Sequence, residues 1–385
     1  MAALRTRNAL LLVKIETTEG TDAVPSAATD AVLVEVPASP LNFNPTMVET
    51  NEATGSLDPQ GPIVGGLKAT IQCSCYMKGS GTAGTAPEFG TLLKACGWAE
   101  TLTAAAIPVA AEACQTGGST TTAKLGTTAG TTAQQYRGMP INFTGDMTAS
   151  SFITDYTAAK IATLTDTLGA SPGTSTNYQI QKNVLYTPSS AAPPSVTMYL
   201  YLDGLRYIMT GARGTFKLAA DAGGVGKFDF TFSGVMQGKA DAALPSATFN
   251  ATRPPIFRNG VMSYNRIASA VAQLSLDTGN QISFPDDPNI IQGFSYPIIT
   301  SRKIVGSINP LETLVATRDI YTDFTAGTQR IIHARFGSVA GNKIGITIPQ
   351  AQATDQNIGD RNGLREIGTP FQAIGNDSGA MLCFY

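Results

Sequence analysis

Ser195-Val-Thr-Met-Tyr-Leu-Tyr-Leu202 and the residues that follow it decide the fold. β-Branched and aromatic residues alternate along this run, which is typical of a β-strand. Asp203-Gly204 comes directly after it, and a second run of the same kind begins at Leu205. An Asp-Gly pair between two such runs is a strong signal for a two-residue turn. The sequence therefore predicts a tight β-hairpin here.

The same alternation recurs on both sides of this hairpin. In Lys227-Phe-Asp-Phe-Thr-Phe-Ser233 it places three phenylalanines on one face of a strand. A mainly β protein is therefore expected, of the β-sandwich or β-barrel type. Further strands are predicted at 31–36, 66–77, 139–144, 151–156 and 160–166.

One or two short helices are also predicted. Residues 86–96 have a Pro-Glu pair in the first turn, apolar residues at helical spacing and Gly97 after the end. We expect this helix to cover one face of the sheet. A second, shorter helix is predicted at 309–316, where Asn309 would be the N-cap and the following proline the first helical residue.

The order of predicted elements occurs twice along the chain. Residues 41–96 run from a short apolar segment through an irregular polar stretch to a strand and a helix, and residues 274–316 repeat that order. The identities do not match, so a true duplication and a single large domain both stay open. A duplicated chain would consist of a first β-domain, residues 1–103 with 184–265, and a second β-domain, residues 266–385.

Residues 104–183 differ from their surroundings and are predicted to be an insertion. They begin with an alanine- and threonine-rich segment, which we interpret as a low-complexity linker. A compact alternating block then extends from Tyr136 to Ile180 and predicts a small β-module of its own. The insertion is expected to lie on the outer surface of the assembled protein.

The composition argues against several classes of protein. Only 14% of the 385 residues are charged, and the net charge is −2, so a basic nucleic-acid groove is not indicated. A neutral surface suits a subunit that is buried against copies of itself.

The apolar run 9–13 is too short for an export signal, and no run is long enough to cross a membrane. Five cysteines without framework spacing are expected to be reduced.

A search for chemistry finds no site. The single histidine, His333, has no nucleophile motif near it and is interpreted as a structural residue. Cys73 and Cys75 share one face of a predicted strand, but no further pair supplies the ligands of a zinc site. The acidic run 286–289 lacks the spacing of a calcium loop. We therefore assign no catalytic, metal-binding or cofactor-binding residue and expect neither an enzyme nor a cofactor.

Six stretches, in the same order along the chain, carry a resemblance to a known family. They are Leu11–Asp22, Gly79–Gly97, Leu202–Phe216, Phe230–Gly234, Leu274–Gln281 and Gly359–Leu364. Together they resemble the major tail tube proteins of long, non-contractile (siphovirus-type) bacteriophage tails, over residues 1–103 and 184–385. The insertion departs from that pattern and looks like the small β-modules that are grafted onto phage structural proteins.

The resemblance implies a tail-tube-type β-sandwich or barrel and a structural virion protein without catalytic activity. Such a protein assembles with itself into rings, which stack into the hollow tail tube that conducts the genome during ejection. A duplicated chain would form a trimeric, pseudo-sixfold ring, and an unduplicated one a hexameric ring. By family analogy, further partners are the tape measure, tail terminator and distal tail proteins.

The resemblance also concerns the place of the protein and what passes through it. Double-stranded DNA would pass transiently and without specificity through a lumen that is poor in positive charge. The protein would be found in the virion tail, after assembly in the bacterial host cytoplasm, with no membrane partner.

Two long polar stretches, 46–64 and 278–297, are predicted to contact adjacent subunits or rings, although plain surface loops are an alternative. The candidate contact residues are Asn51, Glu52, Leu57, Asp58, Gln60, Pro62, Asn280, Asp286, Asp287, Asn289 and Tyr385.

Two other functions stay open. A minor tail protein or a capsid-decorating β-protein would share the composition. A carbohydrate-binding or hydrolytic β-domain should have clustered aromatics and a carboxylate pair in a cleft, whereas the single tryptophan, Trp98, follows the end of the first predicted helix.

Overall fold

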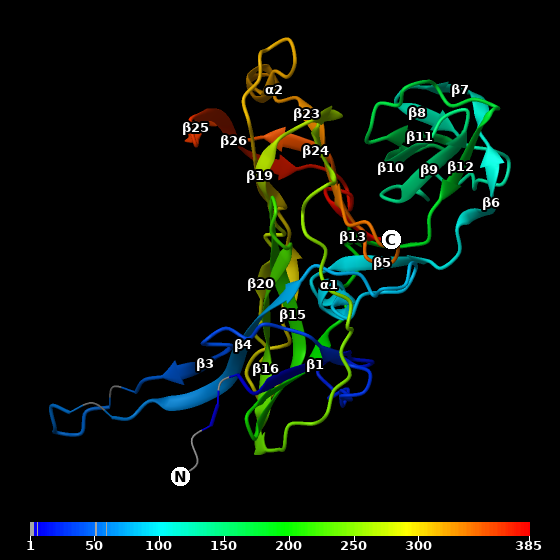
Figure 1. The fold of residues 1–385 in the computed structure, drawn as a ribbon. Helices are drawn as coiled ribbons and strands as arrows, with labels where there is room; N and C mark the ends of the chain where they lie inside the picture. The colour runs from blue at the N-terminus through cyan, green and yellow to red at the C-terminus, as the bar shows by residue number, and fades with distance from the viewer. Residues whose placement is uncertain (1–3, 6, 51, 59) are drawn as a thin grey trace.

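The computed structural model describes residues 4–5, 7–50, 52–58 and 60–385, and it is mainly β, as predicted (Figure 1). One sheet, called the long sheet below, runs through most of the molecule. Eight of its described strands form an antiparallel ladder in the order β3, β4, β16, β15, β19, β22, β26, β25. Their bounds are β3 (Leu41–Val48), β4 (Ile63–Tyr76), β16 (Lys227–Asp241), β15 (Leu205–Asp221), β19 (Val271–Asp277), β22 (Val305–Pro310), β26 (Leu364–Ala373) and β25 (Asn357–Arg361).

Further strands branch from this ladder and form the second layer of a sandwich. One branch leaves β15 through β14 (Val196–Leu202), β1 (Ala9–Ile15) and β2 (Ala31–Val32). The other branch begins where β24 (Ile344–Ala353) pairs with β26, and further strands pair with both edges of β24. It contains β23 (Gln329–Phe336), β17 (Val261–Tyr264), β18 (Ile267–Ala268), β27 (Met381–Phe384), β13 (Asn183–Pro188) and β5 (Trp98–Thr103).

The hydrophobic core lies between these layers. As predicted, Phe228, Phe230 and Phe232 share one face of β16, and all three are buried. The predicted first helix is α1 (Gly90–Ala95), which begins a few residues later than expected and ends before Gly97. The Trp98 ring packs against that of Phe216, 5.3 Å away. Leu92 and Leu93 of α1 are buried in the same core, so the apolar side of this helix closes the core over the long sheet, as expected.

The predicted hairpin is confirmed. Leu202 pairs with Leu205 across a two-residue turn, so β14 and β15 are joined by Asp203 and Gly204. Both turn residues have positive φ, 40° and 96°, which is the conformation that favours Asp-Gly in such turns. By contrast, the strand predicted at 31–36 is shorter than expected, because β2 ends at Val32.

The second predicted helix is wrong in position. Residues 305–310 continue as strand β22, and the Asn309 side chain accepts hydrogen bonds from the backbone N–H groups of Ala272 and Gln273, 3.0 and 2.8 Å away, instead of capping a helix. The short helix of this region is α2 (Ile320–Thr325). Its N-cap is Asp319, whose carboxylate accepts from the Thr322 N–H at 2.9 Å.

The insertion forms a separate lobe beside the sandwich (Figure 1). The predicted strands of its compact block are confirmed. However, the segment interpreted as a linker also contributes three strands, which complete a seven-stranded sheet in the described part of the chain. The sheet order is β6 (Ile107–Ala113), β12 (Thr176–Ile180), β9 (Pro140–Gly145), β10 (Ala149–Tyr156), β11 (Ile161–Leu164), β8 (Thr122–Lys124) and β7 (Gln115–Ser119). A two-stranded ladder joins β20 (Gln281–Ser283), in the second polar stretch, to β21 (Ile298–Ser301), which follows that stretch directly.

Candidate assembly surfaces

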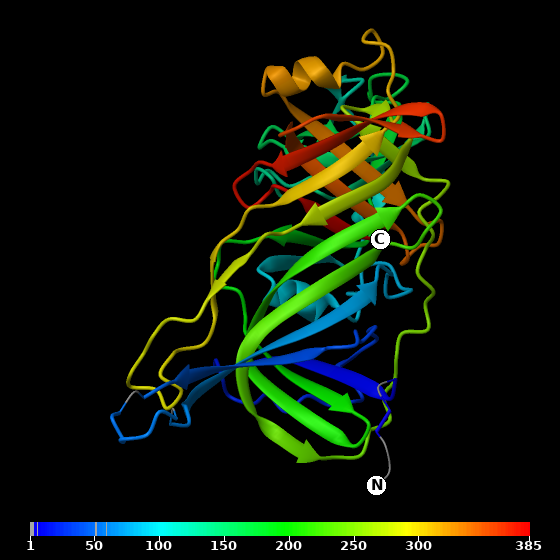
Figure 2. The same ribbon diagram turned by 90° about the vertical axis from the view of Figure 1, so that its left-hand side faces the viewer.

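The first polar stretch is the end of a long hairpin, called the arm below, that projects from the body (Figures 1 and 2). The arm consists of β3, the outer half of β4 and the connection between them. Every described residue from Asn42 to Gly65 is exposed except Thr50, and Leu57 is fully exposed. Of the predicted contact residues, Asn51 lies outside the described residues. The others in the arm, all exposed, are Glu52, Leu57, Asp58, Gln60 and Pro62.

The arm also exposes apolar side chains that the sequence analysis missed. They are Phe43, Met47, Val48, Ile63 and Val64, each about half exposed or more. Exposed apolar surface concentrated on a projecting element indicates an interaction site rather than a solvated loop. A signal was present in the sequence, since Met-Val and Ile-Val pairs flank the polar connection on both sides.

The second polar stretch packs against the root of the arm (Figure 2). The Gln292 side-chain oxygen accepts a hydrogen bond from the Leu67 N–H at 3.0 Å. The Lys68 ammonium lies 4.5 Å from the ring centroid of Phe294 and 5.0 Å from that of Phe284. A Cβ atom on Gly66 would lie 2.1 Å from the Gln292 carbonyl oxygen, so this close approach requires glycine. The two stretches thus form one continuous surface.

The other end of this stretch is fixed to the body through Arg213. Its guanidinium is buried, forms an ion pair with Glu19 and donates to the Pro297 carbonyl at 2.6 Å. Nearby, the buried Glu16 carboxylate accepts from Ser195, Thr197 and the backbone N–H groups of glycines 20 and 211. These contacts tie the N-terminal segment to the hairpin and to the second polar stretch.

The predicted contact residues outside the arm differ in position. Asp286 and Asn289 are exposed in the second polar stretch, and Asp287 accepts from the Asn289 N–H at 2.9 Å. Asn280 is not a surface residue: its amide is buried and donates to the carbonyls of Cys96 and Gly214 at 2.8 and 2.9 Å. Its contacts are therefore within the chain. Tyr385 is likewise half-buried, at the seam with the inserted module.

That seam is centred on Phe152 of the module. The Phe152 ring is buried between the rings of His333 and Tyr385, with centroids 4.7 and 5.3 Å away. Arg335 donates to the Ser150 carbonyl at 2.6 Å beside it. His333 donates to or accepts from the Thr347 hydroxyl at 2.9 Å, and burial lowers the pKa of its imidazole. This supports the structural role predicted for His333, because a neutral, enclosed imidazole has no access to a substrate.

The solvent-facing side of the long sheet is polar, and several of its charges are paired. Lys217 forms an ion pair with Asp277 at 3.1 Å, and Arg361 forms one with Glu366 at 2.6 Å. Lys227 is paired with Glu35, whose pKa is lowered by hydrogen bonds from Lys227 and Tyr76. Hydroxyl pairs such as Ser275 with Ser307, 2.7 Å apart, also occur on this sheet.

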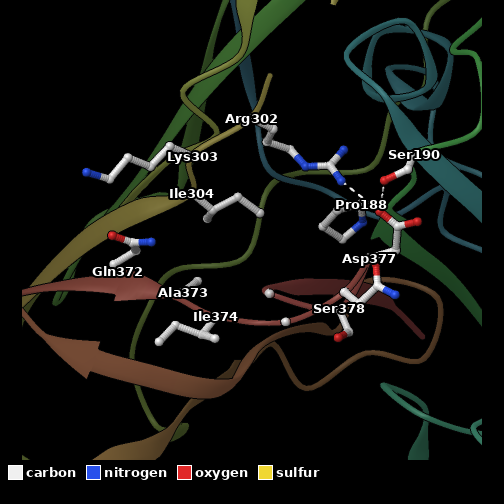
Figure 3. A pocket seen from close by; sticks show the side chains of 13 residues that line it. Pro188, Ser190, Arg302, Lys303, Ile304, Gln372, Ala373, Ile374, Asp377 and Ser378 are labelled. Carbon is white, nitrogen blue, oxygen red and sulfur yellow. Dashed lines mark hydrogen bonds and ion pairs between the residues drawn. The ribbon is translucent and has the colours of Figure 1, made fainter. Parts of the chain in front are cut away.

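A cavity of about 380 Å³ lies where β13, β22 and the β26–β27 loop meet (Figure 3). The Arg302 guanidinium and the Asp377 carboxylate pair across it at 2.9 Å, and the Ser190 hydroxyl donates to Asp377 at 2.6 Å. Burial by itself would raise the pKa of the Asp377 carboxyl, but the hydrogen bonds with Ser190 and Arg302 outweigh it, and the pKa is lowered. Lys303 points away from the pair (Figure 3). The charged groups thus satisfy one another, and the lining has no nucleophile held by a base.

Other signs of chemistry are also weak. All five cysteines are free and buried, and burial raises their pKa values, so they are unreactive core residues. Among the described residues, no group of three or more His, Cys, Asp or Glu side chains is placed to hold a metal ion. No described helix is long and apolar enough to cross a membrane.

These surfaces and the fold can be compared with known proteins. The family model for phage tail tube proteins matches residues 6–373, which is nearly the whole chain and includes the insertion. The chain belongs to the phage tail tube protein family. This membership makes it a structural component of the phage tail. No curated protein sequence matches the chain closely enough to count as a relative.

Proposed function

We propose that this tail tube protein is the major tube subunit of a long, non-contractile tail. Copies of it close into rings, and the rings stack into the hollow tube that conducts the genome during ejection. The single observation that carries this proposal is the long sheet, which runs through most of the molecule and, in the described part of the chain, has a polar face and two open edges. Closure with further copies removes such edges, which are otherwise a liability for aggregation.

The strand order of the long sheet supports a ring of three copies. Its first four strands in space, β3, β4, β16 and β15, are the first, second, fourth and third in sequence. The next four, β19, β22, β26 and β25, have the same order. We call these the first and second ladders. Two ladders of one topology in each chain give a pseudo-sixfold ring from three copies, whereas a chain with one ladder would need six.

The polar face of the long sheet is proposed to line the channel. Its carboxylates neutralise Lys217, Lys227 and Arg361, so these cations are not free to hold DNA phosphates. A duplex can then slide past hydroxyl, amide and acidic groups. The module, on the side of the body away from the arm, would lie outside the tube wall (Figure 1).

The arm is proposed to bind the next ring. It carries exposed apolar residues on a long projecting hairpin, and the second polar stretch supports its root through Gln292 and Phe294. Tape measure, tail terminator and distal tail proteins are the further partners that this role requires. Assembly takes place in the bacterial host cytoplasm.

Electron microscopy of the purified protein in negative stain, with symmetry classification, tests the proposal. Hollow rings or tubes with threefold-modulated sixfold symmetry are expected. Plain sixfold rings would retain the tube and exclude the three-copy ring. A protein that stays monomeric at all protein and salt concentrations would overturn the proposed function.

A further inference from the structure

We infer that neighbouring copies join through one defined strand pair: β25 of one copy adds, antiparallel, to the edge formed by Ser39–Phe43 of the next. Ile358 and Leu41 are opposite each other in this pair. The inference rests on the proposed ring assembly and names the surface that closes it. It follows from a junction of the same kind that already exists inside each chain.

The internal junction is between the two ladders. β15 of the first ladder pairs with β19 of the second, with Leu218 opposite Leu276. Both leucines are buried, so they seal the core where the ladders meet. Flanking hydrogen bonds, from Thr278 N–H to the Phe216 carbonyl and from Ala222 N–H to the Ala272 carbonyl, fix the register.

The ladders can be aligned row by row. In the first, Leu41, Ile71 and Phe232 lie side by side across three strands. In the second, Leu276, Gly306 and Phe371 do so. The row therefore makes Leu41 the counterpart of Leu276.

The same alignment can be extended to the opposite edge of each ladder, which is β15 in the first ladder and β25 in the second. Leu218 pairs with Phe228 in the first ladder, and Ile358 pairs with Ile367 in the second. Phe228 precedes Phe232 by four residues, as Ile367 precedes Phe371. Ile358 is therefore the counterpart of Leu218, the residue that faces Leu276.

Both counterparts lie at open edges. In the described part of the chain, β25 pairs only with β26, and β3 pairs only with β4. Ile358 is 69% exposed although its counterpart is buried, and Leu41 is partly exposed. An apolar side chain that points to the core side of a sheet but lacks a neighbour indicates a missing strand. The missing strand is supplied by a second copy.

The backbone groups are also in phase. Arg361 and Leu364 flank a two-residue turn, so they form a hydrogen-bonded pair, and by alternation the N–H and C=O groups of Ile358 point outward. On the other edge, the Pro40 carbonyl accepts a hydrogen bond from the Gln72 N–H, so the backbone carbonyl of Pro40 faces β4. By alternation, the backbone N–H and C=O groups of Leu41 point away from β4, toward the open edge. Leu218 and Leu276 form a hydrogen-bonded pair in the internal junction, and Ile358 and Leu41 can do the same.

Cysteine cross-linking of the full-length protein tests this register. Asn357 and Asn42 are the counterparts of Lys217 and Asp277, which face each other in the internal junction. Cβ atoms of directly opposed residues are close enough for a disulfide. After mild oxidation with copper phenanthroline, the Asn357→Cys/Asn42→Cys protein is expected to run as covalent oligomers up to a closed trimer on a non-reducing gel.

Matched variants separate the possible outcomes. Each single variant alone should stay monomeric, whereas a mixture of the two should give dimers, because the two edges are different surfaces. A Lys217→Cys/Asp277→Cys protein, which places the pair at the internal junction, should form its disulfide within one chain. If that disulfide forms and rings are seen, but residues 357 and 42 do not cross-link, the strand pair is wrong and the tube is retained. If no rings form, the proposed function itself fails.

A second variant tests the apolar contact. Ile358→Asp should abolish ring formation while the monomer keeps its circular dichroism spectrum and its unfolding midpoint, because the side chain is exposed in a single copy. Val109→Asp, at an apolar position on the module that is also highly exposed, is the control and should leave rings intact. Rings of the Ile358→Asp protein at wild-type yield would overturn the inference.

Discussion

Replacing Phe152 by alanine should loosen the inserted module from the body. The ring is 1% exposed and packs edge-on against Tyr385. Burying such a side chain is worth about 1.5–3 kcal/mol, and an edge-to-face aromatic pair adds about 0.5–1.5 kcal/mol. The cavity that remains adds a further cost, so we expect a total loss of about 3–5 kcal/mol in the free energy of docking and unfolding.

A urea titration followed by two signals measures this loss. Trp98 is the single tryptophan and is buried in the body, so its fluorescence reports on the body alone. Far-ultraviolet circular dichroism reports on the strands of both parts. In the wild type the two signals should change together. In the Phe152→Ala protein the circular dichroism should begin to change at a lower urea concentration than the fluorescence.

Two further variants complete this test. Gly345→Ala would place a Cβ atom 2.4 Å from the Phe152 ring and should weaken docking by about 1–3 kcal/mol through overpacking. Val109→Ala, exposed on the module, should change stability by less than about 0.5 kcal/mol. Coincident transitions at the wild-type midpoint in the Phe152→Ala protein would refute the idea that this ring holds the module.

Three other predictions concern the arm, the module and the channel. Gly66→Ala should displace the second polar stretch from the root of the arm and cost about 1–3 kcal/mol in urea unfolding, whereas Gly61→Ala, with open space around it, should not. The second concerns Glu112 of the module. Burial by itself would raise the pKa of its carboxyl, but hydrogen bonds from two threonines and a tyrosine lower it to about 2. The stabilisation from Glu112 is thus present above its ordinary pKa of 4.5 and is lost as the pH falls through about 2, so Glu112→Gln should lower the melting temperature at pH 7 and have little effect at pH 2. Asp277→Asn frees Lys217 and should slow genome ejection and strengthen the salt-dependent retention of duplex DNA by assembled tubes, unless this face lies outside the channel.

Local sequence patterns predicted much of the long sheet. Alternation placed Phe228, Phe230 and Phe232 on one buried face, and Asp203-Gly204 set the hairpin, because strand period and turn conformation depend on neighbouring residues. The match over residues 6–373 confirms the tail tube part of the family resemblance, whereas the long, non-contractile tail and the major subunit stay a proposal. The tandem arrangement also remains a prediction, which the repeated strand order supports.

The predictions that failed concern residues whose partners are distant in sequence. Asn309 has every local feature of a helix N-cap, but two N–H groups of β19 bind its side chain and hold it in the ladder. Asn280 looked like a loop residue, yet carbonyls about 66 and 184 positions away bury its amide. A polar group adopts the environment in which its hydrogen bonds are satisfied, and only the packed chain determines that environment.

The sequence by itself determined the strands, the tight turn, the first helix and the absence of a recognisable catalytic motif, since each depends on residue types within a few positions. The tertiary structure decided that the two polar stretches meet at the root of the arm, that Phe152 holds the module against His333, and that Ile358 and Leu41 are left at open edges. These features depend on strand pairing between distant segments. Such pairing is set by the burial of one continuous core, which a local pattern does not encode.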